Sequence, residues 1–494
     1  MRSLIETQTS RYQRIVHSTV LPLVLLGLCN CAPSESDVYM YDVVLQGGRV
    51  MDPESGLDGV RNVGIKDGHI EAVSQDPLVG TRTIDATGLV VAPGFIDLHV
   101  HGQNEESFSF MVRDGVTTGL ELEVGTGDVA QWYSEREGGQ LANYGVSVGH
   151  IPVRMIVMKD QGDWLPRDSG GSEPATEEHI AEMVRLTEEG LKQGALAVGF
   201  GLAYTPAATT DEFKTILQKA TSAGATAHIH VRGDGPENSP SDLTGLTEAI
   251  ESASETGTSL HVVHANSSGD SEIVGFLAMI EKARADGQDV TTEAYPYEAG
   301  QTRIESALFD DWETWNDDRF EIHQWVETGE RLTRETFAKY RAQGGSVIIH
   351  SRTEEMTKAA IEHPLTMIAS DGSIRGGLGH PRTSGTYSKV LGKYVRELGA
   401  LTLMDALRKM TIEPARRLQA RVPIMLDKGR IRVGADADLT LFDPATVIDR
   451  STYMKSTIPA NGIPYVLVNG VPVVDDGELM SHVRPGLAVR AEEG

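Results

Sequence analysis

The stretch Gly94-Phe95-Ile96-Asp97-Leu98-His99-Val100-His101-Gly102 decides how the rest of the chain is interpreted. It is typical of a short buried strand that begins after Pro93-Gly94 and ends before Gly102. Side chains alternate between the two faces of a strand, so His99 and His101 point the same way. Two neutral imidazoles on one face can bind one metal ion, whereas two ordinary buried histidines would need only local partners. Polar residues at later strand ends favour the metal site.

Length and charge restrict the class of protein. The chain has 494 residues, which exceeds the usual size of one hydrophobic core, so we expect a large barrel and a smaller domain. The formal net charge is -27. This charge argues against a nucleic-acid partner, because phosphate recognition needs a basic surface, and it disfavours a polyanionic substrate.

Residues 1–31 are typical of an export signal. Arginines precede the apolar run 21–28, which is too short to span a membrane as a mature helix. The run ends in Cys29-Asn30-Cys31, which resembles the lipidation site of a bacterial lipoprotein signal. We favour Cys31 over Cys29, and an ordinary secretory signal is the alternative. We therefore expect a periplasmic or cell-envelope protein that contacts a membrane only through an N-terminal lipid.

The two cysteines of this signal are the only cysteines in the sequence. The mature chain therefore has no disulfide and offers no thiolate to a metal ion. Any bound metal must be held by histidine, aspartate, glutamate or a modified lysine.

Strand-like and helix-like runs alternate through the centre of the chain, which predicts parallel βαβ units. One helical run covers 177–193 and ends at Gly194. Eight such units close a (β/α)8 barrel, the α/β fold class that we predict, with its active site at the C-terminal ends of the strands. The predicted strands are 95–101, 119–124, 146–152, 195–200, 225–231, 260–264, 290–295 and 367–370.

Short strands separated by Asp-Gly and Gly-Gly turns occur near both ends of the chain. We predict that 38–90 and 415–485 together build one β-sandwich beside a barrel over 91–414. Residues 300–363 are too long for a simple loop. We interpret them as an insertion that partly covers the site, although structural elaboration explains them equally well.

Histidines or carboxylates lie at five of the predicted strand ends, in barrel order. Packing alone does not explain this pattern, because buried charges and imidazoles need partners. We therefore expect these groups to form one functional site. They are His99 and His101, Glu121 and Glu123, His228 and His230, His261 and His264, and Asp371.

Several motifs in this order resemble the amidohydrolase superfamily of metal-dependent barrels, and within it the N-acyl-D-amino-acid deacylase branch. The resemblance covers nearly all of the mature chain. It implies hydrolysis of the amide bond of an N-acyl amino acid, or of a small peptide-like amide with a free carboxylate. The motifs are 93–101, Asp114-Gly115-Val116-Thr117-Thr118, Gly149-His150, His230-Val231-Arg232, Tyr295-Pro296-Tyr297, Ser370-Asp371-Gly372, His380-Pro381-Arg382 and Lys409-Met410-Thr411.

The resemblance implies a site for one or two Zn²⁺ ions or another divalent metal. Asp371 would bind the metal and act as general base, taking a proton from water and passing it to the leaving amine. His228 and His261 would support the ligands without binding metal. The histidine ligands would be His99 and His101 for the more buried ion, and His230 and His264 for the second.

One ligand departs from the deacylase pattern. The deacylases place a metal-bridging cysteine at the end of strand 2, where this chain has none, and 195–200 contains no lysine that could replace it. Glu123, nearer the strand's end, is our preferred bridging ligand, and Glu121 is a close second. Either carboxylate could instead orient a histidine ligand. The metal count therefore stays open between one and two.

The resemblance also implies substrate-binding residues. Arg382 would bind the substrate carboxylate with two parallel hydrogen bonds, and a structural ion pair is the alternative. Tyr295 would donate a hydrogen bond near the scissile carbonyl and stabilise the oxyanion. Asn266 and Gln301 stand where the family has lysine and serine, so we expect the pocket to accept different acyl or carboxylate groups.

Two other functions fit the same pattern. A cyclic amidase or deaminase on this scaffold would open a ring or release ammonia. A non-catalytic, lipid-anchored binding protein on a decayed barrel would purify nearly free of metal, and the full ligand set argues against it. The sequence leaves open the chirality of the amino acid, the acyl group and the oligomeric state.

Overall fold

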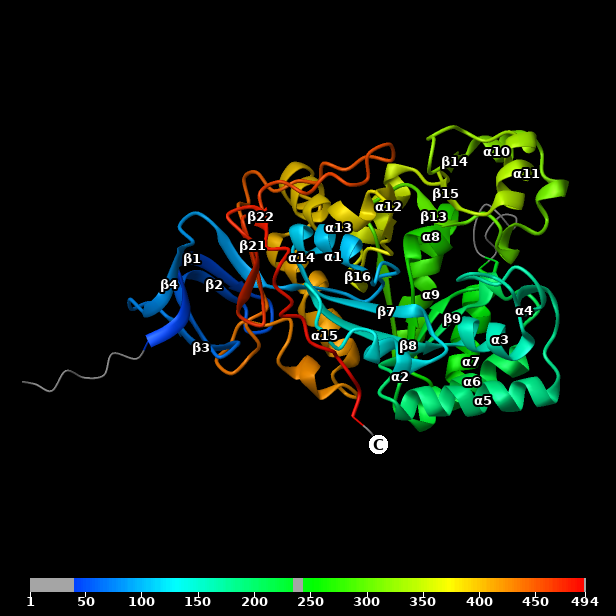
Figure 1. Cartoon of the computed structure of the whole chain (residues 1–494), viewed down its shortest axis with the longest axis horizontal. Helices are drawn as coiled ribbons and strands as arrows, with labels where there is room; N and C mark the ends of the chain where they lie inside the picture. The colour runs from blue at the N-terminus through cyan, green and yellow to red at the C-terminus, as the bar shows by residue number, and fades with distance from the viewer. Residues whose placement is uncertain (1–39, 234–242, 493–494) are drawn as a thin grey trace, which may run out of the picture. The chain divides into compact units, whose positions relative to one another are not determined.

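A parallel barrel lies at the centre of the fold (Figure 1). The computed structural model describes residues 40–233 and 243–492, so the predicted export signal with Cys29 and Cys31 lies outside the described residues. Within them, the predicted barrel strands form one sheet in the order β16-β12-β11-β10-β9-β8-β7-β6, which confirms the predicted fold class. The strands are β6 Phe95–Asp97, β7 Val116–Thr126, β8 Asn143–Gly149, β9 Ala197–Gly201, β10 Thr226–His230, β11 Leu260–Val262, β12 Val290–Ala294 and β16 Thr366–Ile368.

The two outer strands of this sheet, β6 and β16, meet through the residues that follow them. The backbone N–H of Asp371 donates to the carbonyl of His99 at 2.8 Å, and that of His101 donates to the carbonyl of Gly372 at 2.9 Å. Val100 and Gly372 also form a parallel bridge. This contact nearly closes the barrel and brings the first and last predicted site residues together.

Helices cover the outside of the barrel (Figure 1). Helices α5, α6 and α9 pack against β8, β10 and β12, respectively. The strands are therefore buried on both faces, as in β7, where every position from Val116 to Val124 is buried. The helices are α1 Glu105–Met111, α2 Val129–Ser134, α3 His150–Met158, α4 Ser169–Ser172, α5 Glu177–Lys192, α6 Thr210–Ser222, α7 Thr244–Thr256, α8 Ala265–Gly269, α9 Ile273–Ala285, α10 Asp318–Glu321, α11 Arg334–Gln343, α12 Glu354–Glu362, α13 Arg382–Lys389, α14 Leu403–Met410 and α15 Ile412–Leu418. None of the helices in 40–233 or 243–492 is long and apolar enough to cross a membrane.

The helix predicted over 177–193 is confirmed as α5. Its N-terminus is capped by Thr176, whose hydroxyl accepts the backbone N–H of His179. By contrast, the strand predicted over 146–152 ends at Gly149, because α3 begins at His150. A Cβ at Gly149 would lie 1.8 Å from the carbonyl oxygen of Val124, so only glycine fits this junction. Pro152 lies in the first helical turn, where its missing N–H costs no hydrogen bond.

Strands from the two ends of the described chain form a second sheet, which confirms the predicted β domain. β5 pairs with β19 in antiparallel fashion, with Val91 opposite Leu441. All its strands join one continuous hydrogen-bonded sheet. The boundaries predicted between this domain and the barrel stay predictions. The strands are β1 Met40–Asp52, β2 Leu57–Lys66, β3 His69–Ser74, β4 Val79–Asp85, β5 Val90–Pro93, β19 Leu439–Phe442, β20 Tyr465–Val468, β21 Val471–Asp475 and β22 Glu478–Leu479.

The β domain passes directly into the barrel. Only Gly94 separates β5 from β6, and a Cβ there would lie 2.1 Å from Oγ1 of Thr117. A second link is the buried carboxylate of Asp438. It accepts hydrogen bonds from Lys428 Nζ at 2.7 Å and from Asn143 Nδ2 on β8 at 2.9 Å. The sheet of the β domain therefore holds β6, the barrel strand that leads to His99 and His101.

Residues 300–349 include a small three-stranded antiparallel sheet, whose apolar cluster also contains Val124 and Tyr204 of the barrel. The cluster includes Phe309, Trp315, Trp325 and Phe337. Helices α10 and α11 belong to the same segment, which we call the excursion. Its strands are β13 Gly300–Arg303, β14 His323–Trp325 and β15 Ser346–Ile349, and a separate hairpin, β17 Ile374–Arg375 and β18 Leu378–Gly379, follows β16.

Candidate metal centre

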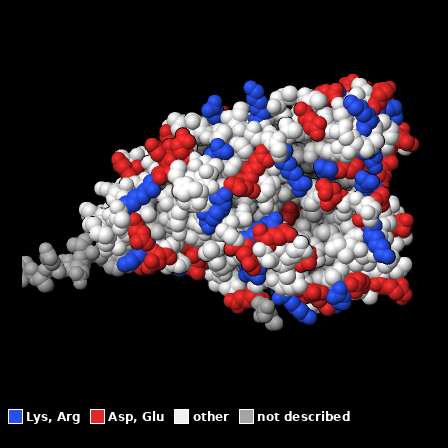
Figure 2. Space-filling model, viewed as in Figure 1, with Lys and Arg blue, Asp and Glu red and all other residues white. Residues whose placement is uncertain are grey.

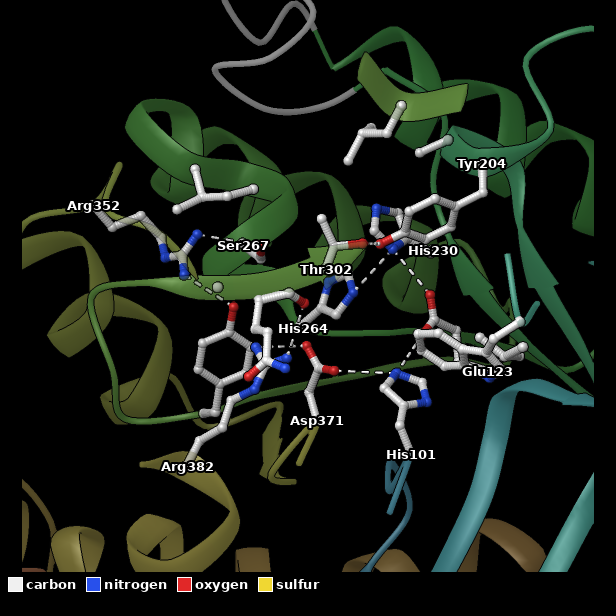
Figure 3. A pocket seen from close by; sticks show the side chains of 18 residues that line it. His101, Glu123, Tyr204, His230, His264, Ser267, Thr302, Arg352, Asp371 and Arg382 are labelled. Carbon is white, nitrogen blue, oxygen red and sulfur yellow. Dashed lines mark hydrogen bonds and ion pairs between the residues drawn. The ribbon is translucent and has the colours of Figure 1, made fainter. Parts of the chain in front are cut away.

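Side chains from the C-terminal ends of five barrel strands meet in one cluster (Figure 3). Their ligand atoms fall into three groups, and within each group all atoms lie within 4.8 Å of one another. These groups unite residues that are far apart in the sequence. The members, which we call the ligand cluster, are His99, His101, Glu123, His230, His264 and Asp371.

Glu123 on β7 lies between two pairs of histidines. Its Oε2 is 2.8 Å from Nε2 of His99 and 3.0 Å from Nε2 of His101. Its Oε1 is 2.9 Å from Nδ1 of His230, which in turn lies 3.2 Å from Nε2 of His264. One carboxylate therefore offers one oxygen to each pair, the arrangement that a bridging ligand requires.

The nitrogen atoms within each pair crowd the same space. Nε2 of His99 and Nε2 of His101 are 3.1 Å apart. Atoms this close need a shared proton or a shared cation. Burial, together with the neighbouring His230, lowers the pKa of His264 to about 3, so this imidazole is neutral, the form that binds metal. Buried imidazoles and carboxylates are ligands that Zn²⁺ prefers, so the residues present fit a divalent metal ion.

Asp371 follows β16 in a left-handed backbone conformation, with φ of 53°. Its Oδ1 lies 3.1 Å from Nε2 of His101, and its Oδ2 lies 2.8 Å from Nη1 of Arg382. Burial opposes ionisation, but the charges of Arg382 and His99 hold the pKa of this carboxyl below its usual range. Asp371 is therefore an ionised carboxylate between the histidines and an arginine.

Glu121, the second carboxylate of β7, lies outside the ligand cluster. Its Oε2 is 2.8 Å from Nδ1 of His101, the nitrogen that faces away from Glu123. Its Oε1 accepts the backbone N–H groups of Val124 and Gly125. Glu121 is thus placed to orient His101, whereas Glu123 is placed to bridge.

His228 and His261 also lie outside the cluster, buried deeper in the barrel. Nδ1 of His261 is 2.7 Å from Oγ1 of Thr291, and Nε2 of His228 is 3.1 Å from Oγ1 of Thr226. Burial is the first cause that lowers the pKa of both imidazoles. These contacts fit histidines that support the fold around the metal ligands without binding metal themselves.

Glu293 on β12 is a site residue that sequence reasoning missed. Its Oε1 lies 2.6 Å from Nδ1 of His99, and its Oε2 lies 3.0 Å from Nε2 of His261. It is buried, and although burial opposes ionisation, His99 and His261 lower its pKa. A carboxylate on the outer nitrogen of a ligating histidine fixes the orientation of the ring. The sequence offered one signal for this role: Glu293 is a carboxylate near the end of a barrel strand, two residues before Tyr295.

We expect the Glu293→Gln substitution to weaken metal binding about 10- to 100-fold, because the amide cannot accept a charge-assisted hydrogen bond from His99. Competition with a chromogenic chelator measures this affinity. The matched control is Glu298→Gln, because Glu298 faces Lys389 and Lys393 and not a histidine. Equal affinities of the Glu293 variant and the unmodified protein would contradict the orienting role.

A pocket opens over the ligand cluster, and Figure 3 shows Arg352 and Arg382 on one side of it and His101 and Glu123 on the other. Tyr295 and Gln301 line it, as expected, together with Arg382. Sequence reasoning missed several lining residues. Trp164 and Arg352 lie on loops without a strand-end signal, and Tyr204 lies in the short 3₁₀ helix directly after β9.

The structure does not place Asn266 where we expected a substrate-binding residue. Its side chain is buried and donates to the backbone carbonyl of Tyr295 at 3.1 Å, and it is not among the residues that line the pocket. The short amide reaches this carbonyl within the fold, so it braces the loop after β12. A substrate contact by Asn266, expected from its position in the family pattern, does not fit this placement.

Comparisons with known proteins agree with this site. Residues 82–474 match the amidohydrolase family. The chain is 29% identical to an N-acyl-D-glutamate deacylase and 30% identical to a D-aminoacylase, both from Alcaligenes xylosoxydans xylosoxydans. The first alignment covers 91% of this chain and 97% of the relative, and the second covers 89% and 96%.

A solved structure supports the same relationship. The N-acyl-D-glutamate deacylase of Bordetella bronchiseptica, crystallised with zinc and a phosphonate inhibitor, superimposes with a TM-score of 0.77. The alignment covers 92% of this chain and 100% of that chain, at 25% identity. The resemblance to the D-aminoacylase-like branch is confirmed. The chain belongs to the amidohydrolase family.

Proposed function

We propose that this protein is a metal-dependent amidohydrolase that releases an amino acid from an N-acyl amino acid. The observation that carries the proposal is the position of Glu123, with one oxygen 2.8 Å from Nε2 of His99 and the other 2.9 Å from Nδ1 of His230. Asp371, next to both the cluster and Arg382, supplies the base that hydrolysis needs. The deacylase relatives support an N-acyl amino acid as the substrate class.

The ligand cluster would hold one or two Zn²⁺ ions, with Glu123 as bridging ligand. When bound, a divalent metal supplies a Lewis acid that polarises the scissile carbonyl and lowers the pKa of water. The zinc in the Bordetella structure supports this choice of metal. Metal analysis of the purified protein by mass spectrometry tests identity and count together.

Asp371 handles the proton in the reaction that we propose. Its Oδ1 takes a proton from the attacking water and returns it to the nitrogen of the leaving amine. Arg382 binds Oδ2 and so aims Oδ1 at the ligand cluster. Arg382 also lines the pocket, where its guanidinium stacks over Tyr295 and is placed to meet the substrate carboxylate.

Tyr295 stabilises charge on the carbonyl oxygen. Its hydroxyl accepts a hydrogen bond from Nη2 of Arg352 at 2.9 Å, so its own proton remains available for donation. Preorganised donors of this kind favour the tetrahedral transition state over the planar amide.

The test is amine release from the metal-loaded protein with a panel of N-acyl-D-amino acids, N-acyl-L-amino acids, dipeptides and cyclic amides. We expect release from one stereochemical series, and the D series is our choice because the relatives are D-acylases. Ring opening or ammonia release without free amino acid would replace this function with that of a cyclic amidase or deaminase. Protein that purifies without metal and releases no product would indicate a binding protein.

We also propose that the partner is a small molecule and that the protein is exported. On the face in Figure 2, acidic side chains are interspersed with basic ones, which does not suit nucleic-acid phosphates. The signal-like sequence of residues 1–31 supports a periplasmic or envelope location, with lipidation at Cys31. Cell fractionation, with Cys31→Ala compared with Cys29→Ala, tests the anchor.

A further inference from the structure

Arg352 enters the pocket from outside the barrel strands. It lies between β15 of the excursion and α12, and it lines the pocket together with Arg382, Ser267 and Gly300. Its Nη2 donates to the Tyr295 hydroxyl at 2.9 Å, and its Nη1 donates to the Ser267 hydroxyl at 3.3 Å. The guanidinium is therefore held on the pocket wall by two hydroxyl groups.

The charge of Arg352 is poorly compensated compared with that of Arg382. Arg382 forms an ion pair with Asp371 at 2.8 Å. The side-chain hydrogen bonds of Arg352 to described residues go to neutral hydroxyls, and its buried Nε has no hydrogen-bond partner among them. Asp270 is close enough for the Arg352 charge to oppose the rise in the Asp270 pKa that burial causes. Within 40–233 and 243–492, Arg352 forms no ion pair with a carboxylate, and a guanidinium with an unpartnered N–H group is a site for an external anion.

The space in front of these donors is kept open by Gly300. A Cβ built on Gly300 would lie 3.3 Å from Oη of Tyr295, 3.6 Å from Nη2 of Arg352 and 3.9 Å from Oγ of Ser267. Because Gly300 has no side chain, these three polar groups face the pocket uncovered. We call this arrangement the cradle, and an oxygen of a ligand can approach it from the pocket.

The ring of Tyr295 lies between the cradle and Asp371, the proposed catalytic base. Arg352 and Arg382 lie 5.5 Å and 4.6 Å from the centre of the same Tyr295 ring, and Arg382 contacts Asp371. Figure 3 shows both arginines on the same side of Asp371. An N-acyl amino acid carries its carboxylate one carbon from the scissile nitrogen, so both groups fall within one compact site.

We propose that Arg352, with Ser267, is a second substrate-binding residue, which holds the carboxylate of the N-acyl amino acid together with Arg382. It supplies the cation that Asn266 does not supply. The inference rests on the proposed function, and it adds that the segment between the excursion and α12 carries part of the specificity. Trp164, Leu308 and Ile349 line the same pocket beside the polar Gln301 and Thr302, so an N-acyl amino acid with an apolar side chain is a suitable probe.

The test is the Arg352→Gln variant, assayed with an N-acetyl amino acid and with the corresponding carboxamide. N-acetylleucine of the hydrolysed series is the probe. We expect KM for the acid to rise about 10- to 100-fold, because one charged hydrogen-bond donor is lost. Loss of the hydrogen bond from Arg352 to Tyr295 should lower kcat by the same factor for the acid and for the carboxamide. We expect KM for the carboxamide to stay within about threefold. An equal KM change for acid and carboxamide, or no change for either, would overturn the proposal.

Two further variants keep the test decisive. Arg352→Lys should recover part of the affinity for the acid, and Gly300→Ala should weaken it by filling the cradle. Arg185→Gln is the matched control, because Arg185 lies exposed on α5, pairs with Glu182 at 2.7 Å and lines neither this pocket nor the hollow beside it. It should leave both KM values unchanged.

A binding measurement separates this proposal from the proposed function. Calorimetric titration of N-acetylleucine into metal-free protein should show weaker binding to Arg352→Gln than to the unmodified protein. If no N-acyl amino acid is hydrolysed, the proposed function fails, yet this difference would still support the anion site. Equal binding to both proteins would refute the role of Arg352 even where hydrolysis is observed.

Discussion

The Asp371→Asn variant should lower kcat about 10²- to 10⁴-fold, the range that a positioned general base contributes. Asparagine has the shape of aspartate and tolerates the left-handed backbone at this position, where φ is 53°. The amide can still accept a hydrogen bond from Arg382, but it cannot take a proton from water. The loss should therefore appear in kcat at saturating substrate and not in the folded state.

Three measurements on the variant check this prediction: kcat, bound metal per chain and the midpoint of thermal unfolding. Asp67→Asn is the matched control, because Asp67 has φ of 51° in an exposed turn between β2 and β3. It should retain full activity. Turnover by Asp371→Asn close to that of the unmodified protein would show that another group is the base.

The Glu123→Gln variant should lose metal and activity together. The amide offers one oxygen and one NH₂ group, so it cannot present an oxygen to both histidine pairs. Since groups that merely support a metal ligand already contribute 10- to 100-fold, we expect turnover to fall by about 100-fold or more. Mass spectrometry should find less metal per chain than in the unmodified protein at the same free zinc concentration.

Glu121→Gln is the informative comparison, because it changes the neighbouring carboxylate on the same strand. Among the described residues, the carboxylate of Glu121 contacts the outer nitrogen of His101 and two backbone N–H groups. We expect this variant to keep its metal stoichiometry with a smaller loss of affinity. The reverse order, with metal lost from Glu121→Gln and kept in Glu123→Gln, would exchange the two roles.

The barrel could be predicted from the sequence because its strands are buried on both faces. Such strands are continuous apolar runs, and β7 and β9 were recognisable for this reason. For the same reason the predicted end of β8 was wrong, because the apolar run continues through Gly149 into α3. The small sheet of the excursion was not predictable, because β15 pairs with both β13 and β14, and such pairings are tertiary.

The ligand cluster could be predicted because residues at strand ends of a closed barrel must meet. Glu293 and Arg352 lacked a comparable signal. Glu293 acquires its role only because β12 lies beside β11, where His261 can donate to the second oxygen of its carboxylate. Arg352 lies in the short segment after the excursion, and no periodicity in the sequence predicts that this segment reaches the pocket. For Asn266 the sequence predicted a role that the structure does not support. We expected its side chain in the pocket, but it donates to the backbone carbonyl of Tyr295 inside the fold.

The single residue between β5 and β6 has a consequence for the order of folding. His99 and His101 are synthesised early, but the strand before them is completed by β19, which is among the last parts of the chain to be made. Contacts this distant in sequence form slowly, because the intervening chain must first be brought together. Asp371 likewise reaches His99 only when the barrel closes. Metal acquisition is therefore a late event, and a chain still emerging from the ribosome has no complete site to load.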